Sequence, residues 1–321
     1  MAEYTPNLDL FRPGTDPNLE VEGTLDENFL KIDEKLGDSL TDRANKKWAS
    51  LGERLNDEQE KFDVVQADVT RLKNKSVNVL FNHHYFRCIA LRGAPRSAPL
   101  NTLIGYRIAV EWGYWGIYAD AQLTSDNHWV MFSDTTVDNL TTGTGTLRNM
   151  TLAQVKALDV GTKFNQVQFG GEQIASLEDY LLILRSTQCV PVINLVGTYT
   201  DIQIKSLVDI LTDWSLLDDA VVVSNQLSNL QRVRIYTPIL GVGLYIPTHT
   251  EQSLNDIQAL GNGFALYADS QVTKDNVRLA HSKNVPIVAF MHDDRHQRIR
   301  ELIALGIRGV VTANVPAIRG V

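Results

Sequence analysis

Cysteine and positive charge are both scarce in this chain of 321 residues. It has two cysteines, Cys88 and Cys189, each inside an apolar run, so neither a disulfide framework nor a cysteine metal site is expected. Acidic side chains outnumber basic ones by 38 to 30, which gives a formal net charge of -8. Because nucleic-acid binding depends on basic side chains that contact phosphates, this balance argues against a nucleic-acid partner.

Long apolar runs are missing as well. No segment approaches the run of about 20 apolar residues that spans a membrane. The opening "MAEYTPNLDLFRPGTD" lacks the basic start and apolar core of a secretory signal. Hydrophobic residues nevertheless make up 44% of the chain, enough to bury one large core or two smaller ones. We therefore expect a globular protein made in a cytoplasm, without a membrane partner.

The first 80 residues show two patterns. Residues 1–23 hold several prolines among scattered apolar residues, which predicts extended chain without helix. A helix is expected to begin at Thr24, because Thr24 and Glu27 form a capping box. Between Trp48 and Leu72 a seam of residues recurs at alternating spacings of three and four, and all of them except Glu58 are apolar, which indicates a short coiled coil. The alternative is an amphipathic helix packed on the following domain.

From Phe86 onward, segments typical of strands and helices alternate. The expected strands are 86–91, 116–122, 190–195, 220–225, 239–246, 264–269, 285–291 and 309–314. The expected helices between them are 102–112, 201–214, 250–260, 274–283 and 295–305. Such alternation builds a parallel sheet covered by helices, and eight units predict a (β/α)8 TIM barrel of the α/β class.

One more strand, at 128–133, follows its predecessor too closely for a parallel crossover. It is expected to turn back as a hairpin arm at the barrel mouth. The segment 134–187 then becomes a long insertion with two helices, which begin near Thr151 and Ser176.

A series of short motifs runs along the predicted barrel. In order they are "LRGAPRSAPLNT" at 91–102, "YAD" at 118–120, "SD" at 133–134, "TVDNLTTGTG" at 136–145, "NLV" at 194–196 and "TANVP" at 312–316. Their order and spacing resemble the glycerophosphodiester phosphodiesterase family. The resemblance implies a TIM barrel whose mouth uses two histidines as acid and base, an arginine for the phosphate, carboxylates for a divalent cation and a lysine that stabilises charge.

Several positions depart from that pattern. The resemblance places the two histidines at Leu91 and Ser133, and the lysine at Val196. Two of the metal carboxylates fall on Tyr118 and Asn194. Leucine has no proton to give, serine is a very poor base at neutral pH, and one remaining carboxylate is a poor site for a hard dication. These substitutions predict an inactive member of the family, with no catalytic residue, no metal and no cofactor.

Three polar residues do match the motifs. They are Arg92, Asp120 and Asp134, and with Tyr118 they form the predicted ligand site at the barrel mouth. A guanidinium can hold phosphate oxygens in a bidentate way, so Arg92 favours a surface glycan or a polyol phosphate as ligand. In the alternative interpretation, Arg92 is a buried structural partner of Asp120 or Asp134.

A polar cluster follows the strand at 285–291, at the end of the barrel where enzymes of this fold place their active sites. It consists of His292, Asp293, Asp294 and His296. The cluster offers a relocated acid-base or metal site, although polar residues also open ordinary exposed loops.

A second resemblance covers residues 4–36, "YTPNLDLFRPGTDPNLEVEGTLDENFLKIDEKL". This segment is similar to the openings of tail or fibre proteins of bacteriophages that infect Gram-positive bacteria. It implies a virion-anchoring segment at 1–23, a helical coiled-coil stalk at 24–80 and the barrel at 81–321. The implied localisation is the virion, made in the host cytoplasm.

The resulting prediction is a bacteriophage virion structural protein, a tail or fibre component whose inactive barrel serves receptor binding and host adhesion. Its implied partners are other virion proteins through the N-terminal segment, two further copies in a homotrimer through the stalk, and wall teichoic acid or a surface glycan. Two alternatives remain. One is a purely structural assembly protein, and the other is an active glycerophosphodiester or teichoic-acid hydrolase with relocated catalytic residues.

Overall fold

The computed structural model describes residues 86–185, 187, 189–291 and 296–313. The extended segment predicted at 1–23 and the coiled-coil stalk predicted at 24–80 lie outside the described residues, and so does the homotrimer expected from the stalk. The described helices include none with the length and apolar character of a membrane span.

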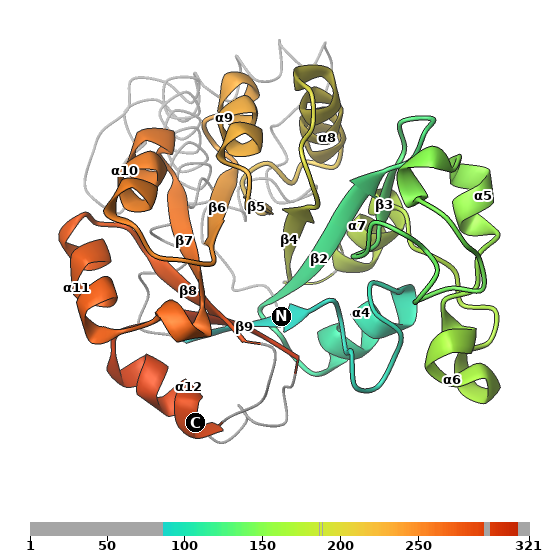
Figure 1. Cartoon of the computed structure of the whole chain (residues 1–321), viewed down its shortest axis with the longest axis horizontal. Coiled ribbons are helices and arrows are strands. Elements are labelled where there is room, and N and C mark those ends of the chain that lie inside the picture. Colours follow the sequence, from blue (N-terminus) through green and yellow to red (C-terminus); the bar gives the residue numbers. More distant parts are fainter. Residues whose placement is uncertain (1–85, 186, 188, 292–295, 314–321) are drawn as a thin grey trace, which may run out of the picture. The chain divides into compact units, whose positions relative to one another are not determined.

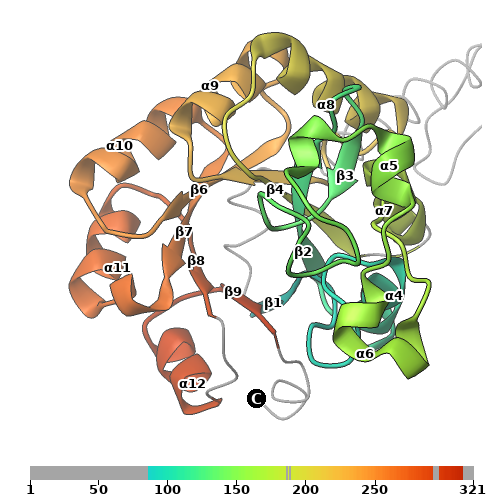
Figure 2. The same ribbon diagram turned by 45° about the vertical axis from the view of Figure 1, so that its right-hand side comes forward.

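Eight parallel strands of the described chain form a closed barrel. They are β1 (Arg87–Leu91), β2 (Gly116–Leu123), β4 (Val190–Leu195), β5 (Val221–Ser224), β6 (Gly241–Ile246), β7 (Gly263–Ala268), β8 (Ile287–Phe290) and β9 (Gly309–Thr312). The ring closes because β1 pairs with both β2 and β9. Figure 2 shows the strands around one axis with the helices outside. The predicted α/β barrel is confirmed.

Helices cover the outside of this ring (Figure 1). They are α4 (Leu103–Glu111), α5 (Leu152–Lys156), α6 (Gly161–Phe169), α7 (Leu177–Arg185), α8 (Asp201–Asp213), α9 (Leu227–Tyr236), α10 (Glu251–Leu260), α11 (Lys274–Ser282) and α12 (His296–Ala304), with 3-10 turns η3 (Leu147–Asn149) and η4 (Asp269–Gln271). Thr102, Thr200, Thr250 and Thr273 each accept a hydrogen bond from the amide three residues later. These threonines therefore fix where four of the helices begin.

The hydrophobic core has two layers. The outer layer lies between the strands and the helices, and the inner layer fills the barrel with side chains such as Ile89, Tyr118 and Val288. Gly243 leaves the space that the Phe264 ring occupies, because a Cβ at position 243 would come within 2.4 Å of that ring. The barrel interior is therefore packed, as is usual for this fold, and binding is confined to its ends.

The strand β3 (Trp129–Met131) runs antiparallel to β2, as the short spacing predicted. The insertion that follows it contains α5, α6 and the start of α7, and it has a small core of its own. That core includes Phe132, Val137, Leu147, Val155 and Ile174. The insertion is thus a folded lobe beside the carboxyl end of β2 (Figure 1).

Tyr180 of α7 links strands β2 and β4 on this side of the barrel. Its hydroxyl is fully buried, donates to the carbonyl of Ile117 at 2.7 Å and accepts from the N–H of Val192 at 3.1 Å. Burial raises the pKa of Tyr180 well above its ordinary value, so the phenol stays protonated.

Replacing Tyr180 by phenylalanine should leave the two buried backbone groups without this partner. We expect the free energy of unfolding to fall by about 1–3 kcal/mol, measured by urea denaturation. The matched control is Tyr236→Phe on α9, since the half-buried Tyr236 hydroxyl has no hydrogen-bond partner among the described residues. Equal stabilities of the two variants would contradict the role given to Tyr180.

Candidate functional site at the barrel mouth

The turn after β1 holds the first polar residues of the mouth. Arg92 and Gly93 both have left-handed backbone angles, with φ of 57° and 90°. A Cβ on Gly93 would lie 2.7 Å from the carbonyl carbon of Gly105, so this turn needs glycine to pack against α4. The chain returns at Asn101, whose N–H donates to the carbonyl of Arg92 at 3.0 Å. Arg92 and Asn101 are therefore fixed side by side.

Asp120 lies near the carboxyl end of the neighbouring strand β2, with only 3% of its side chain exposed. Its Oδ2 accepts from Arg92 Nε at 2.5 Å and from Asn101 Nδ2 at 3.3 Å. Its Oδ1 accepts from Asn194 Nδ2, on β4, at 2.7 Å. A buried carboxylate is costly unless it is paired and hydrogen-bonded, and here one cation and two amides meet that need.

The structure brings together only part of the predicted ligand set. Arg92 and Asp120 form an ion pair, with 28% of the Arg92 side chain exposed. Tyr118 lies deeper in the barrel, 4% exposed, with its ring 5.5 Å from that of Phe290. Burial, reinforced by the neighbouring Asp120 charge, raises the pKa of Tyr118 well above its ordinary value. The phenol is therefore neutral and faces the core.

Asp134 follows the hairpin and makes no hydrogen bond with this pair. Its Oδ1 accepts from the hydroxyl of Ser133 at 2.8 Å, and its carbonyl accepts from Gln122 Nε2 at 2.8 Å. Because Gln122 follows Asp120 by two residues on β2, Asp134 lies at the same strand end. The Asp134 side chain is half-buried, so water reaches it. Its role as a ligand residue stays a prediction.

The positions assigned to the two histidines hold groups without acid-base capacity. Leu91 is 4% exposed and belongs to the barrel core. Ser133 uses its hydroxyl to donate to Asp134. Any proton transfer at this mouth must therefore use other side chains.

Arg148 is a mouth residue that the motifs did not reveal. It belongs to η3 of the insertion, and its Nη2 donates to the carbonyl of Val196 at 2.7 Å. Its guanidinium carbon lies 4.6 Å from the centre of the Tyr199 ring, a cation-π contact. A Cβ on Gly197 would come within 2.9 Å of Arg148 Nη2, so glycine makes room for this side chain. The insertion thereby places a positive charge just beyond β4.

The donor set around Asp120 does not fit a divalent cation. Hard dications take about six or more oxygen ligands, whereas Asp120 contributes one carboxylate whose two oxygens already accept three N–H donors. Asn194 presents its amide N–H to that carboxylate. Over the described ranges, no three His, Cys, Asp or Glu side chains lie close enough to hold a metal ion. No step is therefore assigned to a metal here.

The polar cluster after β8 falls largely outside the described residues. This holds for His292, Asp293 and Asp294, and of His296 only the backbone, at the start of α12, is described. The relocated site predicted there stays a prediction.

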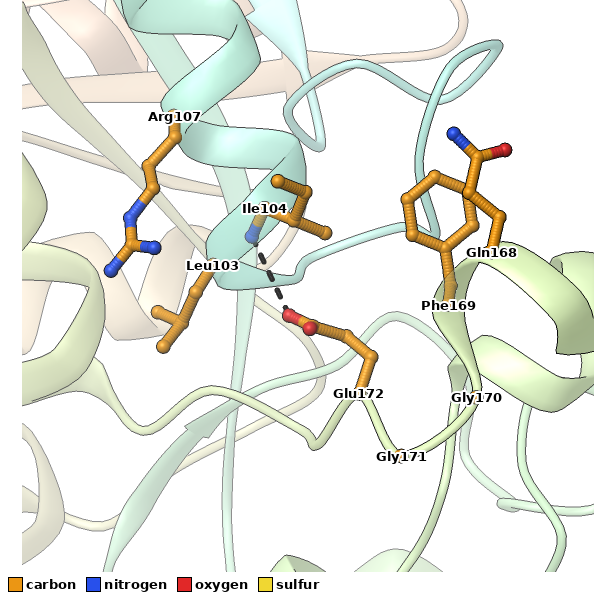
Figure 3. Close-up of a pocket in the computed structure, with 8 residues that line it drawn as sticks. All are labelled: Leu103, Ile104, Arg107, Gln168, Phe169, Gly170, Gly171 and Glu172. Atoms are coloured by element: carbon orange, nitrogen blue, oxygen red, sulfur yellow. Dashed lines mark hydrogen bonds between the residues drawn. The ribbon is translucent and has the colours of Figure 1, made fainter.

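A separate cavity of about 540 Å³ lies between the start of α4 and the end of α6 (Figure 3). It is lined by Leu103, Ile104, Arg107, Gln168, Phe169, Gly170, Gly171 and Glu172. Glu172 points across it, and Oε1 accepts from the N–H of Ile104 at 3.4 Å. Its lining includes none of the mouth residues Arg92, Asp120 and Asn194.

Comparison with known proteins identifies the barrel. The model of the glycerophosphoryl diester phosphodiesterase family matches residues 92–316, most of the chain. The chain belongs to this family. It is 32% identical over 159 residues to a glycerophosphodiester phosphodiesterase of Caldanaerobacter subterraneus, a match that covers 49% of this chain and 65% of the relative. It is 31% identical over 229 residues to YhdW of Bacillus subtilis, whose name proposes the same activity, covering 70% of this chain and 93% of the relative.

Solved structures of the family share the fold. A glycerophosphodiester phosphodiesterase from Agrobacterium tumefaciens superposes with a TM-score of 0.65 at 20% identity, covering 74% of this chain and all of that one. An Oleispira antarctica phosphodiesterase in complex with the product sn-glycerol-3-phosphate gives a TM-score of 0.68 at 20% identity, covering 73% of this chain and 95% of that one. At this identity, the similarity establishes the barrel alone.

These findings correct the function predicted from the sequence. The prediction of a bacteriophage virion structural protein with an inactive barrel is wrong, because the family and its named relatives are phosphodiesterases. The same finding contradicts the prediction that the chain is not an enzyme, together with the receptor-binding and host-adhesion roles derived from it. Substitution at the family's catalytic positions does not by itself make a chain inactive. Those positions show which groups are absent, whereas Arg92, Asp120 and Arg148 still line the mouth.

Proposed function

We propose that this chain is a phosphodiesterase that hydrolyses a glycerophosphodiester at the carboxyl-terminal mouth of its barrel. The observation that carries the proposal is the family match over residues 92–316, which includes an arginine held at the mouth by a buried carboxylate. The proposal agrees with the hydrolase alternative drawn from the sequence, with catalysis assigned to groups other than the two histidines.

Arg92 is the phosphate-binding residue of this proposal. Its Nε is engaged by Asp120, whereas its two terminal nitrogens have no hydrogen-bond partner among the described residues. A guanidinium in this state offers parallel N–H groups to two phosphate oxygens. Asp120 fixes the plane of the guanidinium and does not itself contact the substrate.

Asp134 is the residue assigned to proton transfer. It is the half-buried carboxylate at the end of β2, and its side chain is held by a single neighbouring hydroxyl among the described residues. In the proposed step a water oxygen bonds to phosphorus while its proton passes to Asp134. The bond from phosphorus to the leaving oxygen breaks, that oxygen takes up a proton from solvent water, and Asp134 returns its proton to solvent. The products are a phosphate monoester and an alcohol.

Replacing Asp134 by asparagine keeps the shape of the side chain but removes its basicity. We expect kcat to fall by about 10²-fold, the lower end of the range for an acid-base group, because water can partly replace a half-buried carboxylate. Phosphate affinity should change little. The matched control is Asp138→Asn, an exposed aspartate of the same insertion that accepts from the N–H of Gly145. An equal loss of kcat in both variants would argue against Asp134 as the base.

The activity itself is tested with glycerophosphodiesters that differ in their second alcohol, including a glycerol phosphate polymer. Phosphorus NMR distinguishes the diester from the monoester product and follows the reaction directly. We expect conversion of at least one diester, and loss of that conversion in Arg92→Ala. If the folded protein converts no member of this panel, with or without added Ca²⁺ or Mg²⁺, the proposed function is wrong.

A further inference from the structure

The surroundings of Asp120 are those of a carboxylate whose charge is balanced from within the protein. Arg92 supplies a positive charge to Oδ2, and the amides of Asn101 and Asn194 supply one N–H to each oxygen. Asn101 is itself fixed, because its Oδ1 accepts from the backbone N–H of Asp120 at 3.2 Å. A cation that approached Asp120 would have to displace the guanidinium and turn at least one amide away.

From this arrangement we infer that the mouth binds the phosphate group of its substrate without a divalent cation, with Arg92 as the resident positive charge. The identity of the substrate rests on the proposed function, whereas phosphate binding and its independence of metal do not. Binding a metal here would require several oxygen ligands, and among the described residues no three His, Cys, Asp or Glu side chains lie close enough to supply them, while Tyr118 is buried against Phe290.

The described charges at this end of the barrel cancel, because the carboxylates of Asp120 and Asp134 match the guanidinium groups of Arg92 and Arg148, so an anion is favoured by directed N–H groups and not by net charge. Asp120 neutralises Arg92 in part, and Arg148 adds a second positive charge just beyond β4. Arg148 as a whole residue is half-buried, and its guanidinium contacts the Val196 carbonyl and the Tyr199 ring. A dianionic phosphate at the mouth therefore has guanidinium groups near two strand ends, one of them oriented by a buried carboxylate.

The first experiment measures binding by the full-length protein of inorganic phosphate and of sn-glycerol 3-phosphate. Isothermal titration calorimetry is run once with EDTA and once with millimolar CaCl₂ or MgCl₂. We expect dissociation constants that agree within about twofold between the two conditions, and at least tenfold weaker binding by Arg92→Ala. Binding that appears only after a dication is added would overturn the inference. So would an absence of phosphate binding under both conditions.

The second experiment places a carboxylate at position 194, where the chain has an amide next to Asp120. In Asn194→Glu, a second carboxylate next to Asp120 Oδ1 should repel it and recruit a cation, so that Ca²⁺ raises Tm and improves phosphate binding by at least tenfold. The matched control is Asn225→Glu, an exposed asparagine just beyond the neighbouring strand β5, where Ca²⁺ should have no such effect. If the unmodified protein already responds to Ca²⁺ as strongly as Asn194→Glu, the inference is wrong.

Turnover in the same buffers separates this inference from the proposed function. Phosphate binding in EDTA without cleavage of any diester would leave the inference intact and overturn the function. Cleavage and phosphate binding that both require a dication would leave the function intact and overturn the inference.

Discussion

Replacing Asp120 by alanine is expected to abolish turnover and to lower the free energy of unfolding by about 3 kcal/mol. The change removes a carboxylate that accepts three hydrogen bonds, so the buried amide of Asn101 and the half-buried amide of Asn194 lose their partner. The expected loss lies at the lower end of the range for breaking a buried ion pair, because Arg92 is 28% exposed and can regain water.

The destabilisation is measured by urea denaturation, and the loss of activity by phosphorus NMR on protein that is still folded. The matched control is Asp209→Ala, which breaks an ion pair with Lys205 on α8 where both side chains are more than half exposed. That variant should lose no more than about 0.5 kcal/mol and keep full turnover. If Asp120→Ala is as stable as the control, the three hydrogen bonds to Asp120 do not contribute measurably to the free energy of unfolding.

Replacing Arg92 by alanine is expected to lower kcat/KM by about 10³-fold, the upper end of the effect of removing one donor to a developing negative charge. The lost group would contact phosphate oxygens both before and during the reaction, so KM should rise together with the fall in kcat. Arg92→Lys keeps the charge without the planar pair of donors, and its kcat/KM should lie between those of the alanine variant and the unmodified protein.

The matched control for Arg92 is Arg278→Ala on α11, an exposed arginine on the outer surface of the barrel, which should leave both constants unchanged. In Arg92→Ala the buried Asp120 loses its charged partner, and this loss could unfold the protein. Circular dichroism therefore checks that each variant is folded. A folded Arg92→Ala protein with unaltered kcat/KM would remove Arg92 from the binding site and restrict it to pairing with Asp120.

Much of the fold could be predicted because it depends on short-range patterns. Buried parallel strands appear in the sequence as runs of apolar, β-branched residues. The segment before 128–133 is too short for a parallel crossover, so a hairpin could be predicted there. Two helices, α6 and α9, were not predicted from the sequence. In α6 the backbone departs from helical angles at Asn165, with φ of -162°, and α9 has only Asn229, Leu230 and Val233 buried, which gives a weak apolar stripe. Their patterns carried too little information, and the tertiary structure determines them.

The candidate site was predictable only in outline. The motifs placed Arg92 and Asp120 at neighbouring strand ends, and the pairing of these two was one of the interpretations the sequence allowed. The hydrogen bonds from the amides of Asn101 and Asn194 to Asp120 could not be predicted. The spacing of motifs indicates the strand end at which a side chain lies, but not which of its atoms faces a neighbour. Arg148 was missed because the folding of the insertion brings it to Val196, 48 residues further along the chain.

The closure of the ring by β1 has a consequence for how this protein folds. Arg87 pairs with Gly309, so the closing contact joins segments about 220 residues apart, and such long-range pairings form slowly because the loop-closure entropy must first be overcome. Arg92 follows β1 directly, and Asp120 stands on β2. The pairing of β1 with β2 brings Arg92 to Asp120, so anion binding requires β1 to be in place beside β2. In a refolding experiment, regained phosphate binding should lag behind the recovery of helical signal.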